Sequence, residues 1–229
     1  VINTAGPLTN AQGTKVWEFT VRDGGSAGDV DSKSTIVTGL TLTQNSGNSV
    51  NDWADAIESC DLFDANGNHL DQATLSATQI VFSGFSFTVP DNQQRTFSVR
   101  LTVQTNPNNN GTNNDGDDFV FNLSNTNITA NASGSQFGTF TSISSANGKN
   151  VLDATATVLE FVQQPSDVGV NAIMNPYVTV RGKDANGNID NGPLVVSITS
   201  DGTLDVTPKT ASITNGLATF GNIIHTASA

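Results

Sequence analysis

Two short acidic loops hold the residues of this sequence that are best suited to chemistry. Calcium takes about six to eight hard oxygen ligands, and carboxylates on glycine-rich loops supply them. Carboxylates this close together repel one another unless a cation or solvent screens them. We expect no required cofactor: the first interpretation is that both loops are simply solvated, and Ca²⁺ is the candidate ligand that they would bind otherwise. The candidate ligands are Asp23, Asp29 and Asp31 in RDGGSAGDVDS, and Asp115, Asp117 and Asp118 in NNDGDDF.

The pentapeptide DANGN occurs twice, at residues 64–68 and 184–188. An EF-hand calcium loop needs glycine at its sixth position and glutamate at its twelfth. DANGN has its glycine at the fourth position, and neither copy has the distal glutamate. Asn-Gly between alternating apolar residues is instead the strongest short signal for a hairpin, because both residues tolerate positive φ. The sequence predicts that each copy is a bend between strands.

The sequence contains few side chains that could support nucleophilic catalysis. The only histidines are His69 and His225, and Cys60 is the only cysteine. Neither a G-x-S-x-G nucleophile turn nor a phosphate-binding glycine loop is present. Cys60 follows an apolar spacing, so we expect it to be buried and inert. A pair of glycosidase carboxylates stays open, because the separation that matters cannot be read from sequence. We expect a protein that is not an enzyme and has no catalytic residues.

Sugar binding is the main alternative function, and it needs exposed aromatic rings. Trp17 shares one face of an alternating segment with Phe19 and Val21, and Trp53 lies on an apolar helical stripe. Tyr177, beside a proline at the start of a strand, is the aromatic residue we expect outside. One ring is a weak platform, so carbohydrate binding ranks second.

Composition limits the partners. Nine basic and 21 acidic residues give a net charge of −12 and a pI near 4.2. Such a surface repels nucleic-acid phosphates and anionic lipid, so we expect neither as a partner. No long apolar run is present, so we expect no membrane insertion. The chain begins with Val1 rather than methionine, and we expect it to be a processed or excised piece of a longer protein.

The elements that must position these loops are strands. Apolar residues alternate with polar ones in VWEFTV, TFSVRLTVQ and DFVFNL, the pattern of strands with one face in a core and one in water. Clusters of Asn, Asp and Gly separate these segments. The exception is NDWADAIESC, whose apolar residues at helical spacing predict one or two turns of helix behind an Asn51 cap. The fold class we expect is all-β, with two tandem antiparallel β-sandwich modules.

The character of the sequence changes near residue 150, after the polar stretch SISSANGKN. We expect three parts in the chain. These are 1–14, a linker or a strand from a preceding module; 15–156, a β-sandwich; and 157–229, a second, Ig-like domain that is apparently truncated at its C-terminal end.

The second domain resembles the bacterial Ig-like repeats of large cell-surface proteins. The residues that carry the resemblance are FVQQP at 161–165, PYVTVRGKDANGN at 176–188 and GLATF at 216–220. The resemblance implies an Ig-like sandwich whose closing strands are missing, which would leave an unpaired edge.

The first domain is similar to β-sandwich modules of very long surface proteins, including the SprB-type gliding adhesins exported by type IX secretion. VWEFTVRDGG, NDWADAI and DGDDFVFNL carry this similarity. It implies a structural or adhesive repeat segment of an extracellular adhesin or filament, and gliding motility is one role that the resemblance suggests. The implied partners are neighbouring modules of the same chain and a surface polysaccharide or other cell-surface molecule. The further alternative is an accessory domain of a secreted enzyme.

Overall fold

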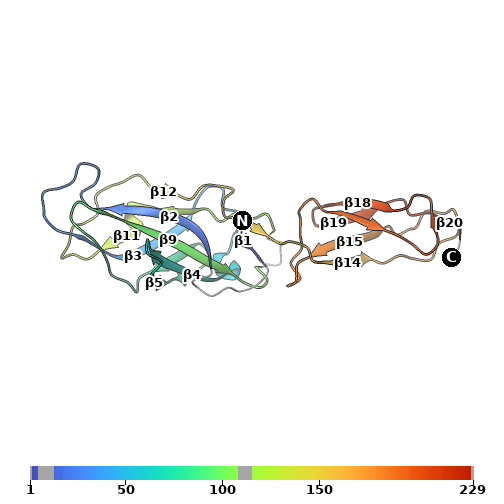
Figure 1. Cartoon of the computed structure of the whole chain (residues 1–229), viewed down its shortest axis with the longest axis horizontal. Helices are drawn as coiled ribbons and strands as arrows, with labels where there is room; N and C mark the ends of the chain where they lie inside the picture. Colours follow the sequence, from blue (N-terminus) through green and yellow to red (C-terminus); the bar gives the residue numbers. More distant parts are fainter. Residues whose placement is uncertain (1, 5–12, 108–114, 228–229) are drawn as a thin grey trace. The chain divides into compact units, whose positions relative to one another are not determined.

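In the computed structural model the chain is almost entirely β, as predicted (Figure 1). The structure describes residues 2–4, 13–107 and 115–227. These divide into two compact units. Unit 1 contains Ile2 and the described residues up to Leu152, and unit 2 contains Asn3, Thr4 and the residues from Asp153 onward. The division lies a few residues before the boundary expected from sequence.

Unit 1 contains two antiparallel sheets that enclose one core. The four-stranded sheet runs in the order β2 (Thr14–Arg22), β9 (Gln94–Val103), β4 (Ile57–Asp64) and β5 (His69–Gln72). The seven-stranded sheet is built around β3 (Thr35–Gln44) and contains β6 (Thr74–Leu75), β7 (Gln79–Phe82), β8 (Phe87–Val89), β10 (Phe121–Leu123), β11 (Ile128–Ala130) and β12 (Ile143–Ser144). A short 3₁₀ helix, η2 (Asn125–Asn127), precedes β11.

Aromatic rings fill the core between these sheets. Trp53, Phe97 and Phe121 are fully buried. The ring centroid of Trp53 lies 5.3 Å from that of Phe121, and Phe121 stacks on Trp17 at 6.4 Å. Offset and tilted ring pairs at such separations add to the free energy gained from burial alone. The alternation read from the sequence therefore places the aromatic rings on the inner faces.

The predicted helix is a single turn, α1 (Trp53–Ala56). Asp52, not Asn51, caps it, because the Asp52 carboxylate accepts hydrogen bonds from the backbone N–H groups of Ala54 and Asp55. The helix ends at Ala56 because β4 begins at the next residue and pairs with β9. The apolar stripe thus continues as a strand, and Cys60 lies in the core from β4 rather than from a helix.

Unit 2 contains a five-stranded antiparallel sheet and a two-stranded one. The five strands run in the order β14 (Val158–Gln163), β15 (Val178–Lys183), β19 (Leu217–Phe220), β18 (Lys209–Thr214) and β16 (Val195–Ile198), and the two-stranded sheet pairs β17 (Thr203–Leu204) with β20 (His225–Ala227). The core is small and includes Val178, Val180 and Phe220. The edge strand β14 is exposed over most of its length.

The N-terminal residues, expected to form a linker or a strand from a preceding module, contain a short strand. Residues 5–12 of that part lie outside the described residues. β1 (Ile2–Asn3) pairs with β13 (Leu152–Asp153). Thr4, which follows, is 2% exposed and is bonded to residues of unit 2. Asn3 and Thr4 are therefore built into the second unit of the same chain.

Both DANGN segments form bends, as predicted, and their hydrogen bonds match closely. In the first, Oδ1 of Asp64 accepts hydrogen bonds from the N–H groups of Asn66 and Asn68, at 2.9 and 2.8 Å. In the second, Asp184 binds Asn186 and Asn188 in the same way, at 2.8 and 2.9 Å. The expected reason was partly wrong: the glycines have positive φ, 81° at Gly67 and 90° at Gly187, but the asparagines before them do not. The aspartate side chain, rather than a second left-handed residue, closes each bend.

Candidate functional site

One of the two acidic loops brings carboxylates together. Asp23, Asp29 and Asp91 each place an oxygen within 4.8 Å of the others. Asp23 directly follows β2 and is 1% exposed, whereas Asp29 is exposed on the same loop. Among the residues that the structure describes, this is the only such group of three. It is the best-formed candidate cation site in that part of the chain.

Asn92 holds this cluster together. Its backbone N–H donates to Oδ1 of Asp23 at 3.0 Å, and its side-chain oxygen accepts from the N–H of Asp29 at 2.8 Å. Thr35 Oγ1 donates to the other oxygen of Asp23 at 2.6 Å. A carboxylate has lone pairs left after such bonds and can still bind a cation. Partial desolvation, and then the charges of Asp31, Asp23 and Asp91, raise the pKa of Asp29.

The tight packing of this loop against Asn92 explains why glycine occupies positions 24 and 28. A Cβ on Gly28 would lie 2.5 Å from Oδ1 of Asn92, and one on Gly24 would lie 2.6 Å from the same atom. Both glycines have positive φ, at 75° and 72°. Larger residues would displace Asn92 from the cluster, so these glycines shape the site.

Asp31, the third predicted ligand of this loop, is not part of the cluster and binds other residues instead. Its carboxylate accepts hydrogen bonds from the N–H of Lys33 at 2.8 Å and from Oγ of Ser135 at 2.9 Å. These two bonds lower its pKa. Asp91 takes its place in the cluster. Sequence reasoning missed Asp91 because it lies on the turn between β8 and β9, far from the first loop in sequence.

The second predicted loop serves a different purpose in the described structure. The Asp118 carboxylate accepts hydrogen bonds from the backbone N–H groups of Gly148 and Asn150, and so ties this loop to residues 148–150. Desolvation raises the pKa of Asp117 against an opposing hydrogen bond with Ser49. Asp115, Asp117 and Asp118 do not form a close group of three like that at Asp23 among the described residues. Calcium binding at this loop stays a prediction.

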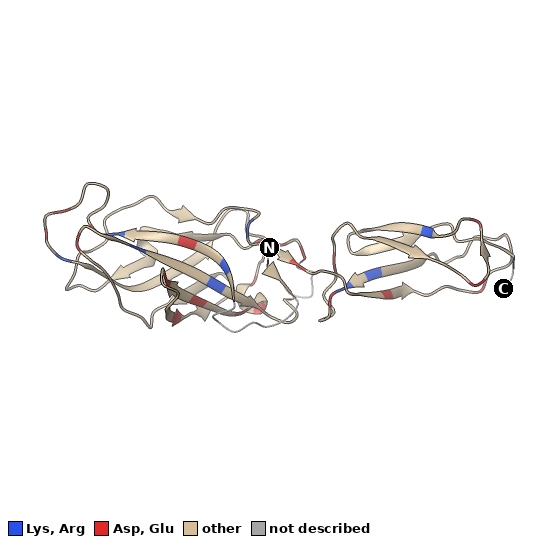
Figure 2. Ribbon diagram, in the orientation of Figure 1, with Lys and Arg blue, Asp and Glu red and all other residues tan. Residues whose placement is uncertain are grey.

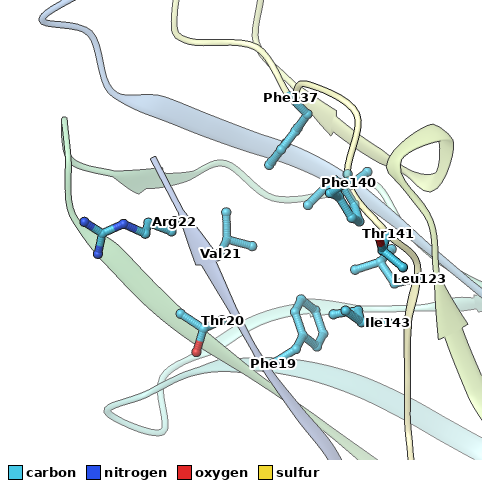
Figure 3. A pocket seen from close by; sticks show the side chains of 10 residues that line it. Phe19, Thr20, Val21, Arg22, Leu123, Phe137, Phe140, Thr141 and Ile143 are labelled. Carbon is cyan, nitrogen blue, oxygen red and sulfur yellow. The ribbon is translucent and has the colours of Figure 1, made fainter. Parts of the chain in front are cut away.

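An apolar cavity of about 270 Å³ opens at the side of unit 1, beside β2 (Figure 3). Phe19 and Val21 of β2 line one wall, and Phe137, Phe140 and Ile143 line another. Figure 3 shows the rings of Phe137 and Phe140 above β2, with Arg22 at one end. The surface that lines the cavity is mostly apolar and offers few polar groups that could activate a substrate. It can accept one large apolar group.

The histidines do not form a catalytic set in the described part of the chain. Nε2 of His69 lies 2.8 Å from Oδ1 of the buried Asp61, but Cys60 points into the core on the opposite face of β4. Burial raises the pKa of the Cys60 thiol, as expected for an inert cysteine. His225 lies 3.5 Å from Oγ of Ser200, which is too long for a strong hydrogen bond.

The exposed aromatic rings do not form a platform for sugar. Trp17 is partly buried against the core. Within the described ranges, the exposed aromatic residues are Phe161 at 44% and Tyr177 at 47%. Phe161 lies opposite Val180 on the core side of unit 2, whereas Tyr177 precedes β15. Lys and Arg residues are few, and their positions along the ribbon are scattered over strands and loops (Figure 2).

Comparisons with protein-family models, with curated proteins and with solved structures find no match to this chain. Among its described residues, no helix is long and apolar enough to cross a membrane.

Proposed function

We propose that the chain is a structural and adhesive segment of a large secreted cell-surface protein of adhesin or filament type. The observation that supports this most is the length of the antiparallel pairing in unit 1. β9 lies between β2 and β4 and pairs with both along most of its ten residues. Long ladders of backbone hydrogen bonds around an aromatic core suit a unit that keeps its shape under load.

The loops would carry any contact with other molecules. Loops on a rigid scaffold are the usual place for binding residues, and the loops of unit 1 carry the carboxylates described above. The partners under this proposal are neighbouring modules of the same chain and a molecule of the cell surface. The location would be extracellular.

Calcium belongs to the same proposal, at Asp23, Asp29 and Asp91. A Ca²⁺ ion there would offset two of the three negative charges and join the end of β2 to the turn before β9. That junction lies at one end of the most extensive pairing in unit 1. Calcium would therefore stiffen the unit rather than serve chemistry.

Pulling single molecules by their two ends tests the mechanical proposal. We expect unit 1 to unfold in one step, at forces well above those that unfold unit 2, whose core is smaller. Gradual extension of unit 1 at low force, without a distinct step, would contradict a load-bearing role.

A further inference from the structure

Strand β2 has an edge that pairs with no other strand in the described part of the chain. β2 is an end strand of the four-stranded sheet, and its one partner there is β9. The N–H of Asp23 donates to the carbonyl of Gln93, and the register between the two strands is unbroken from there back to Glu18. Successive residues of an antiparallel strand point their backbone groups to opposite sides. The N–H and C=O groups of Glu18, Thr20 and Arg22 therefore point away from β9.

This edge is not protected against pairing with another strand. Natural sheets protect their edges with proline, with bulges or with charged side chains. From Glu18 onward β2 contains no proline and no irregularity in its pairing. Charged side chains protect an edge when like charges of two copies meet. On β2 the two charged side chains that flank Thr20, those of Glu18 and Arg22, are exposed and have opposite signs.

The spacing of these residues makes the edge complementary to itself. Glu18 lies two residues before Thr20, and Arg22 lies two residues after it. When two copies of β2 run antiparallel with Thr20 opposite Thr20, Glu18 of each copy lies opposite Arg22 of the other. All three positions have outward backbone groups, so the hydrogen bonds form where the charges meet. On the core side, Phe19 of each copy lies opposite Val21 of the other, and both are apolar.

We propose that two copies of the chain associate through β2 in this register, about a twofold axis at Thr20, so that their four-stranded sheets become one continuous sheet. Other antiparallel registers that bring outward backbone groups together match fewer charges. An axis at Glu18 or at Arg22 places like charges opposite each other, which is destabilising. An axis at Phe19 or at Val21 leaves both charges without an opposite one. The axis at Thr20 is the register that joins both pairs.

The net charge of −12 is not concentrated at this edge. β2 and β9 carry four of the nine basic residues and one acidic residue, Glu18. The basic residues are Lys15, Arg22, Arg95 and Arg100. The two strands nearest the axis therefore have no excess of negative charge that would keep the copies apart. Lys15 binds one carboxylate oxygen of Glu18 at 2.9 Å, which leaves the other oxygen for Arg22 of the second copy.

The apolar cavity adjoins the same edge. Two of the outward-facing residues of β2 belong to its lining, and Phe137 and Phe140 form the wall above β2 (Figure 3). A strand added to β2 would bring the core-side residues of the second copy, Phe19 and Val21, beside this cavity. Apolar surface would then leave water in both copies at once, which favours association.

Both copies use the same surface, so the contact closes after two copies and leaves no free site for a third. The proposal depends on the β2 edge alone. It holds or fails independently of the adhesive function, which the pulling experiment tests.

Analytical ultracentrifugation of the whole chain tests the proposal with two charge variants. Arg22→Glu and Glu18→Arg each place like charges opposite one another at both pairs. We expect the mass of the wild type to rise with concentration from 23.8 kDa toward twice that value and no further. Each variant alone should associate at least about tenfold more weakly, because two attractive pairs become repulsive. An equimolar mixture of the two variants should form dimers again, because every pair across the axis then joins opposite charges.

Arg95→Glu is the matched control, because it makes the same change of charge at an exposed residue of β9, which is not an edge strand. We expect it to associate like the wild type. Thr20→Pro tests the backbone without changing the charge. It removes an outward N–H at the axis and leaves the pairing with β9 intact, so it should also weaken association.

Circular dichroism checks that each variant folds. If a single charge variant does not fold, the double change Glu18→Arg with Arg22→Glu replaces it, and this double variant should associate like the wild type. A wild type that stays monomeric up to about millimolar concentration overturns the proposal. So do assemblies that grow beyond two copies, a mixture of the two variants that remains monomeric, or single variants that associate as strongly as the wild type.

Discussion

Oγ1 of Thr4 donates a 2.6 Å hydrogen bond to Oδ2 of Asp184, although the two residues lie 180 positions apart in the chain. The side chain of Asn186 returns a bond to the carbonyl of Thr4 at 2.8 Å. The start of the chain is thereby fastened to the second DANGN bend, and the first bend has no such partner among the described residues.

Removing the Thr4 hydroxyl is expected to loosen unit 2. Thr4→Val removes one of the two hydrogen bonds that Oδ2 of the buried Asp184 accepts, the other coming from the Asn188 side chain. Loss of a hydrogen bond to a charged group costs about 1.5–3 kcal/mol. Hydrogen exchange of peptides from β15 and β19 should become faster, while exchange in unit 1 stays unchanged. Thr219→Val is the control, because Thr219 is exposed on β19. Equal effects of the two changes would contradict the role given to Thr4.

The two DANGN aspartates should differ in their contribution to acid stability. Burial would raise the pKa of Asp184, but hydrogen bonds from Thr4, Asn188 and Asn186 outweigh it, and the pKa is lowered. A carboxyl with a lowered folded-state pKa adds stability above its unfolded pKa, and that stability is lost as pH falls through the folded value. Asp184→Asn should therefore flatten the loss of unit 2 stability as the pH falls below about 4.

Asp64→Asn provides the comparison. The hydrogen bond from the Asn68 side chain, ahead of the backbone bonds, lowers the pKa of Asp64 as well. Asp64 is more exposed, so solvent screens its interactions more strongly. Denaturant unfolding across this pH range should show a smaller change for Asp64→Asn. A larger change at Asp64 than at Asp184 would contradict the importance of burial.

Calcium is expected to raise the melting temperature of unit 1. A cation that binds only the folded state stabilises it in proportion to the logarithm of its concentration above Kd. The rise should appear in Trp fluorescence, because both tryptophans, Trp17 and Trp53, lie in unit 1. The double change Asp29→Asn and Asp91→Asn should abolish it, and Asp55→Asn should not. A melting temperature that is the same in excess calcium and in chelator would exclude this site.

The aromatic core should dominate the stability of unit 1. Phe121 is fully buried and contacts both Trp17 and Trp53. Phe121→Ala is expected to lower the free energy of unfolding by about 3–5 kcal/mol through lost burial and a cavity. Val30→Ala, at a side chain that is 99% exposed, should change it by less than about 0.5 kcal/mol. Denaturant titration followed by Trp fluorescence measures both.

Cys60 should react with thiol reagents only when unit 1 opens. Its side chain is fully buried, and burial raises its pKa, so little reactive thiolate exists at neutral pH. Labelling should be slow in buffer and fast in denaturant, with a rate that follows unfolding. Rapid labelling of the folded protein would contradict this account.

Local signals in the sequence were enough to predict much of the fold. The alternation in TFSVRLTVQ predicted β9, and Asn-Gly predicted both bends, because these depend on neighbours a few residues apart. The helix is one turn, within the predicted one or two, and the apolar stripe through Ile57 and Cys60 continues as a buried strand, which the same residues suit equally well. Tertiary packing, rather than helix propensity, determines that the segment from Ile57 onward is a strand.

The site was predicted less well because distant residues complete it. Asp23 and Asp29 were recognisable from the density of carboxylates on a glycine-rich loop. Asp91 and Asn92 reach the cluster only through the pairing of β2 with β9, which no spacing in the sequence reveals. The docking of Thr4 on Asp184 was unpredictable for the same reason.

Because unit 2 includes Thr4, the order of synthesis matters for its folding. The ribosome makes Thr4 long before the bend that receives it, and nearly the whole of unit 1 is translated in between. During synthesis Thr4 stays exposed to solvent until the strands of unit 2 have been translated. A recombinant fragment starting at residue 153 would never receive it, and would therefore underestimate how well the second unit holds together in the intact chain.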